Sequence, residues 1–532
     1  MDNWSAPASA HPPTTIANAL RDIQPSASGL RPVPLGPRFH DIPIEDLVGA
    51  PQVDLRHGGI DLSPDGGEVA ISWDRSGANE ICVAPVRGDR IYQLTDAGDR
   101  SVSPRWSPDG QWLAFLRDSG GDERFQIWVM RRDGRRLRQV TSAGSADHRD
   151  IAWSPDGSRL ACVSDSTATR HGVEVVDVAS GEHVVLSDFA SDDTTPRWSP
   201  DGRWLLISRD ADLHLIPAAG GAAIRLDTRG GAAGSSVDGR WSPDGRSIAF
   251  TTDMRGHNEI ALAHLDGMLD EPGGARGRSP RVVVLTNSIH DSTEPVWRPD
   301  GRGLVYLQSC EGQVSIRRVF VASHADTPVA DLPGVHGSAQ VGPDSETLAF
   351  AYGSARRPPD VWARLQRAVT PQPLSTSLSP RVDPETLVEP IRVRYPAGAT
   401  DASALLYVPH AEALRGEGSP PAIVHVRSDP PGPTGGWDPT SQWLAHRGYV
   451  VLVLGGSNDP ADVVAGGRWL GQQGIADAER VAVLGAGGPG TLDPIAGQPM
   501  GGTAETQGST VEQRVDRMRR TTEWLDQHLG AR

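Results

Sequence analysis

Lysine is absent from this chain. All 51 basic residues are arginines, and against 67 acidic residues they leave a formal net charge of −16. A chain of this charge is repelled by nucleic-acid backbones and by anionic membranes, because both are themselves negative. We therefore expect neither a nucleic acid nor a membrane surface as a partner.

Cysteine and long apolar runs are also scarce. The three cysteines, Cys82, Cys162 and Cys310, are odd in number and widely spaced, which excludes a disulfide framework and offers no spacing typical of a metal site. No stretch approaches the 18 apolar residues that a membrane-spanning helix needs. Residues 1–43 are rich in proline, alanine and serine and lack the basic start and apolar run of a secretory signal. We expect a cytoplasmic protein without a metal.

A five-residue sequence recurs through the middle of the chain. It reads WSPDG at Pro108, Pro155, Pro200 and Pro243, and in altered form LSPDG at Pro64, WRPDG at Pro299 and VGPDS at Pro343. Successive copies lie 44, 47, 45, 43, 56 and 44 residues apart. A fixed period near 45 residues is typical of a solenoid or a propeller.

Each repeat contains short runs of alternating apolar residues. In the second repeat they are Trp112–Asp118, Gln126–Arg132 and Leu137–Ala143, with a fourth run ending at Trp106. Pro-Asp-Gly supplies the fixed φ, the side-chain acceptor and the positive φ of a tight turn. Four strands per repeat make one blade of a β-propeller, and seven copies predict seven blades. The tryptophans occupy one fixed place in each repeat, which favours packing between blades over ligand stacking.

These repeats resemble those of TolB-like propellers. The order of WSPDG, an apolar-Ala-Phe strand, an Ile-Trp-Val strand and a Val-Thr pair is most similar to the propeller that precedes the catalytic domain in the prolyl oligopeptidase family of serine peptidases, acylaminoacyl-peptidase type. Ile44–Gly67 is similar to the segment that opens that propeller. The resemblance implies three parts: residues 1–43, a propeller over 44–379, and an α/β-hydrolase-like domain over 380–532.

The pattern changes to α/β near Pro380. Strand-like runs at Ala404–Pro409, Ala422–Arg427, Tyr449–Gly455 and Arg480–Gly485 alternate with the helix-like segments Pro439–Gly448 and Ala461–Gly474, and a last amphipathic helix is predicted over Val511–Leu529. Near-continuous apolar strands between helices predict a parallel sheet covered on both faces.

The resemblance implies where the catalytic residues of a serine peptidase would lie. The family turn Gly-Gly-Ser-Tyr-Gly-Gly matches Gly485–Gly490, which puts Gly487 at the position of the nucleophilic serine. A glycine has no hydroxyl to attack with. The family turn His-Gly-Gly-Pro, which lies beside the oxyanion site, is replaced by Arg427, Ser428, Asp429 and Pro430.

The base and the acid of the triad also have no counterpart. Only 42 residues follow Gly490, and counting back from the last helix puts the histidine position near Thr506. His528 falls inside that helix, where it is expected to cap the last turn. Ser428, Ser457 and Ser509 lack the context of a nucleophile turn. We therefore expect a degenerate, truncated hydrolase domain without a catalytic residue.

Gly485-x-Gly487-x-x-Gly490 also matches a dinucleotide-binding fingerprint. That fingerprint requires a helix directly after the glycines and an acidic residue about 20 positions later. Pro494 and Pro499 disfavour a helix here, so we expect no bound nucleotide and no other cofactor.

Three functions are compatible with these residues. The favoured one is a non-hydrolytic pseudoenzyme that holds a peptide or small organic ligand between the propeller and the remnant hydrolase domain. The second is a repurposed enzyme with non-hydrolytic chemistry, such as a cyclase or an isomerase of a biosynthetic pathway. The third is an active peptidase or esterase with an unrecognised site.

Overall fold

The computed structural model divides the chain into two compact units. One consists of Pro51–Tyr352 and Pro359–Ser377, and the other of Met1–Ala50, Gly353–Pro358 and Leu378–Arg532. Throughout, the residues that the structure describes are 42–55, 58–88, 90–96, 98–118, 120–121, 124–141, 146–165, 172–187, 194–230, 232–269, 279–366, 368–398, 400–414, 418–427, 435–455, 459–485, 488–492, 499–500 and 510–529.

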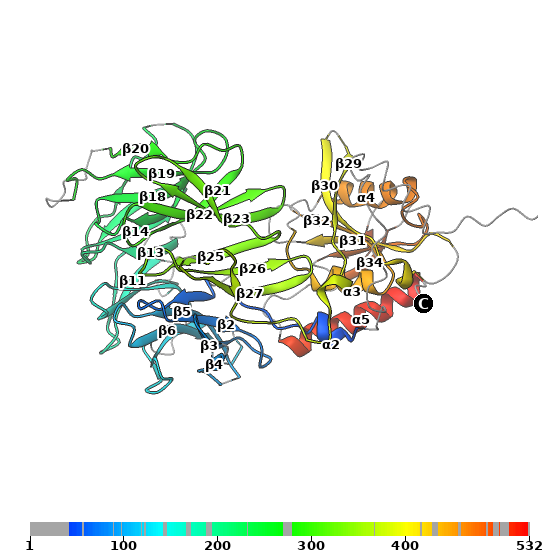
Figure 1. The fold of residues 1–532 in the computed structure, drawn as a ribbon, viewed down its shortest axis with the longest axis horizontal. Helices are drawn as coiled ribbons and strands as arrows, with labels where there is room; N and C mark the ends of the chain where they lie inside the picture. The colour runs from blue at the N-terminus through cyan, green and yellow to red at the C-terminus, as the bar shows by residue number, and fades with distance from the viewer. Residues whose placement is uncertain are drawn as a thin grey trace, which may run out of the picture. The chain divides into compact units, whose positions relative to one another are not determined.

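The first unit is built from antiparallel sheets (Figure 1). Five of the described sheets have four strands each, in the orders β1-β2-β3-β4, β5-β6-β7-β8, β12-β11-β10-β9, β13-β14-β15-β16 and β17-β18-β19-β20. A sixth, eight-stranded sheet contains β21–β24 and β25–β28, joined where Val314 of β23 pairs in parallel with Val335 of β25.

The strands follow the repeat in chain order. Those of the four-stranded sheets are β1 Ile60–Leu62, β2 Glu68–Trp73, β3 Glu80–Pro85, β4 Tyr92–Gln93, β5 Arg100–Trp106, β6 Trp112–Asp118, β7 Phe125–Arg131, β8 Arg138–Gln139, β9 His148–Trp153, β10 Arg159–Ser164, β11 Gly172–Asp177, β12 His183–Val185, β13 Thr194–Trp198, β14 Trp204–Arg209, β15 Asp212–Pro217, β16 Ile224–Arg225, β17 Ser236–Trp241, β18 Ser247–Thr252, β19 Glu259–His264 and β20 Arg281–Val284. Those of the eight-stranded sheet are β21 Asp291–Trp297, β22 Gly303–Cys310, β23 Gln313–Phe320, β24 Asp326–Ala330, β25 Val335–Val341, β26 Leu348–Ser354, β27 Arg357–Arg364 and β28 Gln372–Pro373.

The first strand of each repeat lies against the first strand of the next. Contacts run from β1 to β5, β9, β13, β17, β21 and β25, and β25 contacts β1 again. This closed succession is that of a propeller, with the first strands innermost. The predicted number of seven blades depends on taking the eight-stranded sheet as two.

The Ser-Pro-Asp-Gly turn has the same hydrogen bonds in five repeats. In the second repeat, Ser107 Oγ donates to Asp109 Oδ1 (2.6 Å), which also accepts from the amide of Gln111 (3.0 Å), and Ser107 Oγ accepts from the amide of Trp112 (2.9 Å). Gly110 has φ +67°, a conformation that glycine adopts without strain. The equivalent bonds form at Ser63, Ser154, Ser199 and Ser242. The sequence therefore fixes the hairpin between the first and second strands of these repeats.

The tryptophan before each turn packs between neighbouring sheets, as predicted. Trp106, for example, lies in a core cluster with Ala70 and Val83 of the first sheet and Leu113 of its own. Four indole nitrogens also donate to a carbonyl oxygen of the preceding first strand: Trp153 to Arg105 (2.9 Å), Trp198 to Ala152 (3.1 Å), Trp241 to Arg197 (3.1 Å) and Trp297 to Arg240 (3.0 Å). Each such residue joins two sheets through both its ring and its N–H.

The second unit is a seven-stranded sheet with helices on both faces. Its described elements are α2 Ile44–Leu47, the 3₁₀ helices η1 Pro384–Thr386 and η2 Ala411–Ala413, strands β29 Ile391–Ala397, β30 Thr400–Tyr407, β31 Ala422–Arg427, β32 Val450–Gly455, β33 Val481–Gly485, β34 Gly488–Leu492 and β35 Pro499–Met500, and helices α3 Pro439–His446, α4 Pro460–Gln472 and α5 Val511–Leu529. None of the described helices is long and apolar enough to cross a bilayer.

The prediction of a parallel sheet is wrong outside its centre. The strand order is β29-β30-β32-β31-β33-β34-β35, and only β32, β31 and β33 are parallel. β30 runs antiparallel to β32, and β34 runs antiparallel to β33. Connection length explains two of the antiparallel pairs: β30 begins three positions after β29 ends, and β34 three positions after β33 ends, whereas parallel neighbours require a long crossover.

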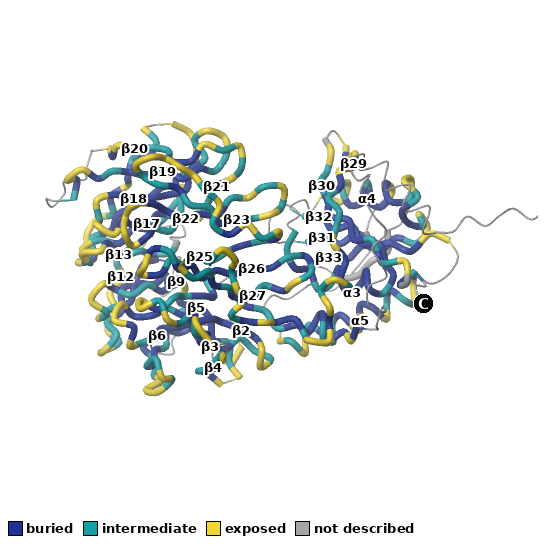
Figure 2. The backbone as a smooth tube through the Cα atoms, viewed as in Figure 1, coloured by how far each residue is buried: buried dark blue, intermediate teal, exposed yellow. Residues whose placement is uncertain are grey.

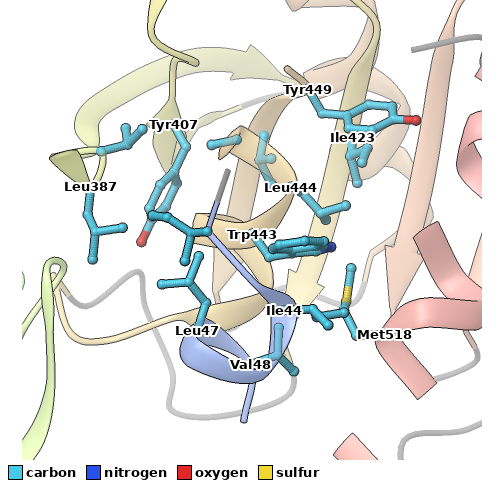
Figure 3. Packing of buried hydrophobic residues seen from close by; sticks show 14 of the residues in the cluster. Ile44, Leu47, Val48, Leu387, Tyr407, Ile423, Trp443, Leu444, Tyr449 and Met518 are labelled. Carbon is cyan, nitrogen blue, oxygen red and sulfur yellow. The ribbon is translucent and has the colours of Figure 1, made fainter. Parts of the chain in front are cut away.

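The central strands of this sheet are largely buried (Figure 2), and its two faces carry separate cores, one of which is drawn in Figure 3. On one face, Ile423 and Tyr407 of the sheet pack with Trp443 of α3 and Met518 of α5. On the other, Val424 and Leu452 pack with Trp469 and Leu470 of α4. The expectation that helices cover both faces is thus confirmed.

The N-terminal helix α2 belongs to this second unit, although the sequence placed Ile44 at the start of the propeller. Leu47 is fully buried in the same cluster as Trp443 and Met518, and Figure 3 shows Ile44, Leu47 and Val48 facing α3. The backbone amide of Ile42 donates to His446 Nε2 of α3 (3.1 Å). Four helical residues have no core of their own, so their apolar face requires partners from elsewhere in the chain.

Candidate functional site

Most of the predicted site residues lie outside the described part of the chain. These are Gly487, Ser428, Asp429, Pro430 and Thr506, and the alternative serines Ser457 and Ser509 lie outside it as well. Arg427 is described and is the last residue of β31. His528 is described in α5, where its ring stacks on Trp524 and its Nδ1 contacts the Trp524 carbonyl oxygen (2.7 Å).

Described strands flank the predicted nucleophile position on both sides in the sequence. Gly485 ends β33 and is the pairing partner of Gly488, the first residue of the antiparallel strand β34. The nucleophile turn of an α/β-hydrolase instead leads from a strand into a helix, whose start helps to expose the serine. The dinucleotide fingerprint requires a helix at the same place. In the described residues, β33 is therefore followed by an antiparallel strand and not by a helix.

A buried cluster of polar side chains lies at the adjacent strand end, and sequence reasoning missed it. It consists of His425 and Arg427 on β31 and of Asp438 and Ser441 at the start of α3. Ser441 Oγ donates to Asp438 Oδ2 (2.8 Å) and lies 3.0 Å from His425 Nδ1. His425 Nδ1 is also 3.5 Å from Asp438 Oδ2, and Arg427 Nη1 is 3.8 Å from the same oxygen.

This cluster contains a serine, a histidine and an aspartate, but their hydrogen bonds differ from those of a triad. A triad histidine stands between the serine and the carboxylate, accepting from one and donating to the other. Here the Ser441 hydroxyl donates directly to Asp438, and Nδ1 of His425 faces both Ser441 Oγ and Asp438 Oδ2. Ser441 is completely buried, which keeps its oxygen away from any substrate. The cluster holds a charge in place and does not activate a nucleophile.

The electrostatics agree with a structural role. Burial alone would raise the pKa of Asp438, but His425, Arg427 and the amide of Ser441 outweigh it and hold that pKa well below its usual range. Burial, with Asp438 nearby, raises the pKa of the Tyr407 hydroxyl well above its usual range. Asp438 is also the N-cap of α3, accepting from the amide of Ser441 (3.0 Å). Asp-Pro-Thr-Ser is a helix-start sequence, so the cap could have been predicted, but its histidine partner could not.

A second charged cluster lies at the centre of the propeller. Arg105, Arg197 and Arg240 precede the tryptophans of β5, β13 and β17, and Asp61 holds the equivalent place in β1. Asp61 interacts electrostatically with Arg105 and Arg197, and Arg197 with Arg240 and Arg105. The first and fourth sheets are not neighbours, nor are the second and the fifth, so these side chains meet only near the axis of the propeller.

Burial changes the pKa values of the charged groups at this propeller centre. It raises the pKa of Asp61 to about 6, an effect that Arg105 and the amide of Trp106 only partly offset. Asp61 Oδ2 accepts from that amide (2.7 Å), and Arg105 Nη1 donates to the carbonyl oxygen of Gly58 (2.8 Å). Burial also lowers the pKa of the Arg197 guanidinium, with Arg240 contributing. The propeller centre therefore holds charges of both signs.

Comparison with known proteins identifies the repeats. The family described as PD40, TolB beta propeller domain, matches residues 57–213 and, in an overlapping match, 150–271. The chain is 32% identical over 149 residues to the peptidase YuxL of Bacillus subtilis (strain 168), an alignment covering 21% of this chain and 22% of that one. It is 30% identical over 135 residues to dipeptidyl aminopeptidase BIII of Pseudoxanthomonas mexicana, covering 24% and 19%. The alignments span about a fifth of the length of each of these two relatives.

Solved structures extend the likeness to both units. A puromycin-hydrolyzing peptidase of Mycobacterium tuberculosis matches with a TM-score of 0.67 and 18% identity, over 84% of this chain and 75% of that one. Acylaminoacyl peptidase of Pyrococcus horikoshii matches with a TM-score of 0.58 and 17% identity, over 84% and 75%. At such identities the likeness establishes the fold alone. Residues 57–271 thus match a TolB-type β-propeller domain, and the chain shares the fold of peptidases of the prolyl oligopeptidase family, which confirms the resemblance inferred from its repeats.

Proposed function

We propose that this chain is a non-hydrolytic relative of the prolyl oligopeptidase family that binds a ligand without cleaving it. The observation that carries the proposal is the hairpin from β33 to β34, in which Gly485 pairs with Gly488. The family resemblance gives the serine position to Gly487, which lies between these two residues in the sequence. Ser441, which lies beside His425 and Asp438, supports the same proposal because it is buried and donates to the carboxylate.

The proposed ligand is a peptide or a small organic molecule. Two similar structures are described as puromycin hydrolases, and puromycin serves here as a probe of that ligand class. Guanidinium groups such as those of Arg105 and Arg240 are suited to a ligand carboxylate. The position predicted for the ligand, between the propeller and the hydrolase-like domain, stays a prediction.

The loss of hydrolysis is tested with a serine-reactive fluorophosphonate. We expect no labelling of the purified full chain, under conditions in which the puromycin hydrolase of known structure is labelled to completion. Stoichiometric labelling would contradict the proposal. A parallel reaction of Ser441→Ala would then report whether Ser441 is the reactive residue.

Binding is tested with puromycin and short peptides by calorimetry, followed by mass spectrometry of the recovered ligand. Saturable binding and an unchanged ligand support the proposal. Cleaved ligand would overturn it in favour of a hydrolase, and a rearranged or cyclised product would overturn it in favour of a repurposed enzyme. An absence of binding across the peptide panel and puromycin would count against the ligand class.

A further inference from the structure

The third sheet of the propeller brings three metal-ligand side chains together. His148 is the first residue of β9, Cys162 lies in β10 and Glu174 lies in β11, on three adjacent strands. Cys162 is the pairing partner of Glu174, and Ser164, two residues after Cys162, is the partner of His148. Directly paired residues share a face of a sheet, as do residues two apart on one strand. All three side chains therefore project from the same face.

The three donor atoms converge in the interior of the propeller. One ligand atom from each residue lies within 4.8 Å of the other two, and the residues are 4%, 0% and 2% exposed, respectively. The face they share turns toward the second sheet, because Cys162 packs with Leu116 and Ile127 in one core cluster. Sequence reasoning predicted no metal here, because 12 residues separate Cys162 from Glu174 and the convergence depends on strand register.

The histidine is oriented as a metal ligand usually is. His148 Nδ1 lies 3.2 Å from the carbonyl oxygen of Phe125, to which it can donate only as N–H. Metal-binding histidines commonly donate one ring nitrogen to a carbonyl and present the other to the ion. The Nδ1 contact thus leaves Nε2 as the nitrogen that can face an ion.

The chemistry of the three donors indicates which ion fits. Imidazole nitrogen, thiolate sulfur and carboxylate oxygen together form a borderline-soft set that suits Zn²⁺ and is a poor site for Ca²⁺ or Mg²⁺. Burial and the neighbouring Glu174 raise the pKa of the Cys162 thiol well above its usual value. A divalent cation reverses this effect, because it stabilises the thiolate and the carboxylate together.

We propose that His148, Cys162 and Glu174 bind a zinc ion between the second and third sheets of the propeller. On binding, the Cys162 thiol loses its proton to solvent and forms the Zn–S bond, with no change of oxidation state. In a tetrahedral zinc site donor atoms lie roughly 3.3–3.6 Å apart, so small side-chain rotations bring these three to the ion. The fourth position is taken by water. Since the residues are buried and lie on three adjacent strands, the ion links β9, β10 and β11 of the third sheet and does not meet substrate.

The proposal is tested on the full chain without a polyhistidine tag, produced in zinc-supplemented medium and dialysed against metal-free buffer. We expect close to one zinc per chain by elemental mass spectrometry, and close to none for Cys162→Ser and His148→Gln. Cys82→Ser is the matched control, because Cys82 is also a buried cysteine of a propeller strand and is not part of the cluster; it should keep its zinc.

Cobalt distinguishes metal loss from misfolding. Replacing zinc by Co²⁺ should give the wild-type chain and Cys82→Ser a thiolate-to-cobalt charge-transfer band that Cys162→Ser lacks, at equal circular dichroism. Removing the metal with a chelator should lower the Tm of the wild type by several degrees and leave that of Cys162→Ser unchanged. A folded wild-type chain that takes up neither zinc nor cobalt, or metal uptake equal in wild type and Cys162→Ser, would overturn the proposal.

Discussion

The contribution of a single tryptophan hydrogen bond to the stability of the propeller can be measured by substitution. Trp198 donates its indole N–H to the Ala152 carbonyl oxygen in the neighbouring sheet. Replacing it by phenylalanine keeps most of the apolar surface and leaves that buried carbonyl without its partner. We expect Trp198→Phe to lower the free energy of unfolding by about 1–3 kcal/mol, measured by denaturant unfolding.

Trp106 provides the matched control. It occupies the same place in the second repeat, but its indole nitrogen has no hydrogen-bond partner among the described residues. Trp106→Phe should therefore cost clearly less than Trp198→Phe. Equal losses would mean that ring packing, and not the N–H, joins the sheets.

The buried carboxylate of Asp438 makes the α/β unit sensitive to acid. Its pKa is lower in the folded chain than in the unfolded one, so its stabilising effect is fully present above about pH 4 and is lost as the pH falls below that value. Asp438→Asn should lower the free energy of unfolding by roughly 1.5–3 kcal/mol at pH 7. The difference in stability between this variant and wild type should shrink below pH 4. Thermal unfolding across a pH series measures it.

Asp459→Asn is the control for this effect. Asp459 also caps a helix, α4, by accepting from the amide of Ala461 (2.8 Å), but in an exposed setting. Asparagine caps helices as well as aspartate does, so this variant should be close to neutral. A loss as large as that of Asp438→Asn would assign the effect to capping alone.

The sequence predicts turn residues well and distant polar partners poorly. The bonds between Ser107 and Asp109 follow from residues two positions apart, and the repeat reproduces them in five places. The partnership of His425 with Ser441, in contrast, depends on the spacing of β31 and α3 in the folded unit. Cys162 and Glu174 meet for the same reason, through a strand register that no local pattern specifies.

Among the elements, α2 depends most on the rest of the fold. Its four residues bury Leu47 against α3 and α5 (Figure 3), and α2 contacts both helices. Leu47→Ala leaves a cavity in that core and should destabilise the α/β unit by about 2–5 kcal/mol. Hydrogen exchange should then rise in α3 and α5 while the propeller strands stay protected. Faster exchange in β5 and β6 instead would show that α2 supports the propeller.

Helices α3, α4 and α5 and the central strands could be predicted because their apolar patterns are long and periodic. The predicted span of α5, Val511–Leu529, agrees with the structure. The sequence did not predict the antiparallel strands β29 and β34, nor the placement of α2. A short apolar run carries no information on its partner, and here the partners are a hairpin neighbour in one case and a helix more than 400 residues away in the other.

At the scale of the whole propeller, the charges at its centre couple stability to pH. The pKa of Asp61 is raised to about 6 in the folded chain, so folding takes up a proton and stability falls as pH rises from about 4 to about 6. Asp61→Asn removes this loss of stability, and the asparagine side chain can still accept a hydrogen bond from the Trp106 amide. We expect the variant to gain stability over wild type across that interval, by about 1–3 kcal/mol, and to keep a constant advantage above pH 6.

The turn residue Asp109 serves as the opposite control. Ser107 and the amide of Gln111 lower its pKa, so Asp109→Asn should lose stability relative to wild type as the pH rises through 4. Thermal unfolding of both variants between pH 4 and 8 compares the expected gain of stability in Asp61→Asn with the expected loss in Asp109→Asn. If the stability difference between Asp61→Asn and wild type did not change with pH, the propeller centre would have to be well solvated.

The membership of α2 in the α/β unit has a consequence for biosynthesis. Residues 42–50 leave the ribosome before the propeller, but α5, whose Arg514 side chain donates to the Ala50 carbonyl oxygen, follows 464 positions later. At translation rates of roughly 5–20 residues per second, α2 waits on the order of 25–90 seconds for this partner. The whole propeller emerges during that interval. The nascent chain thus exposes the apolar face of α2, with Leu47 at its centre, as a site where a chaperone can bind until synthesis is complete.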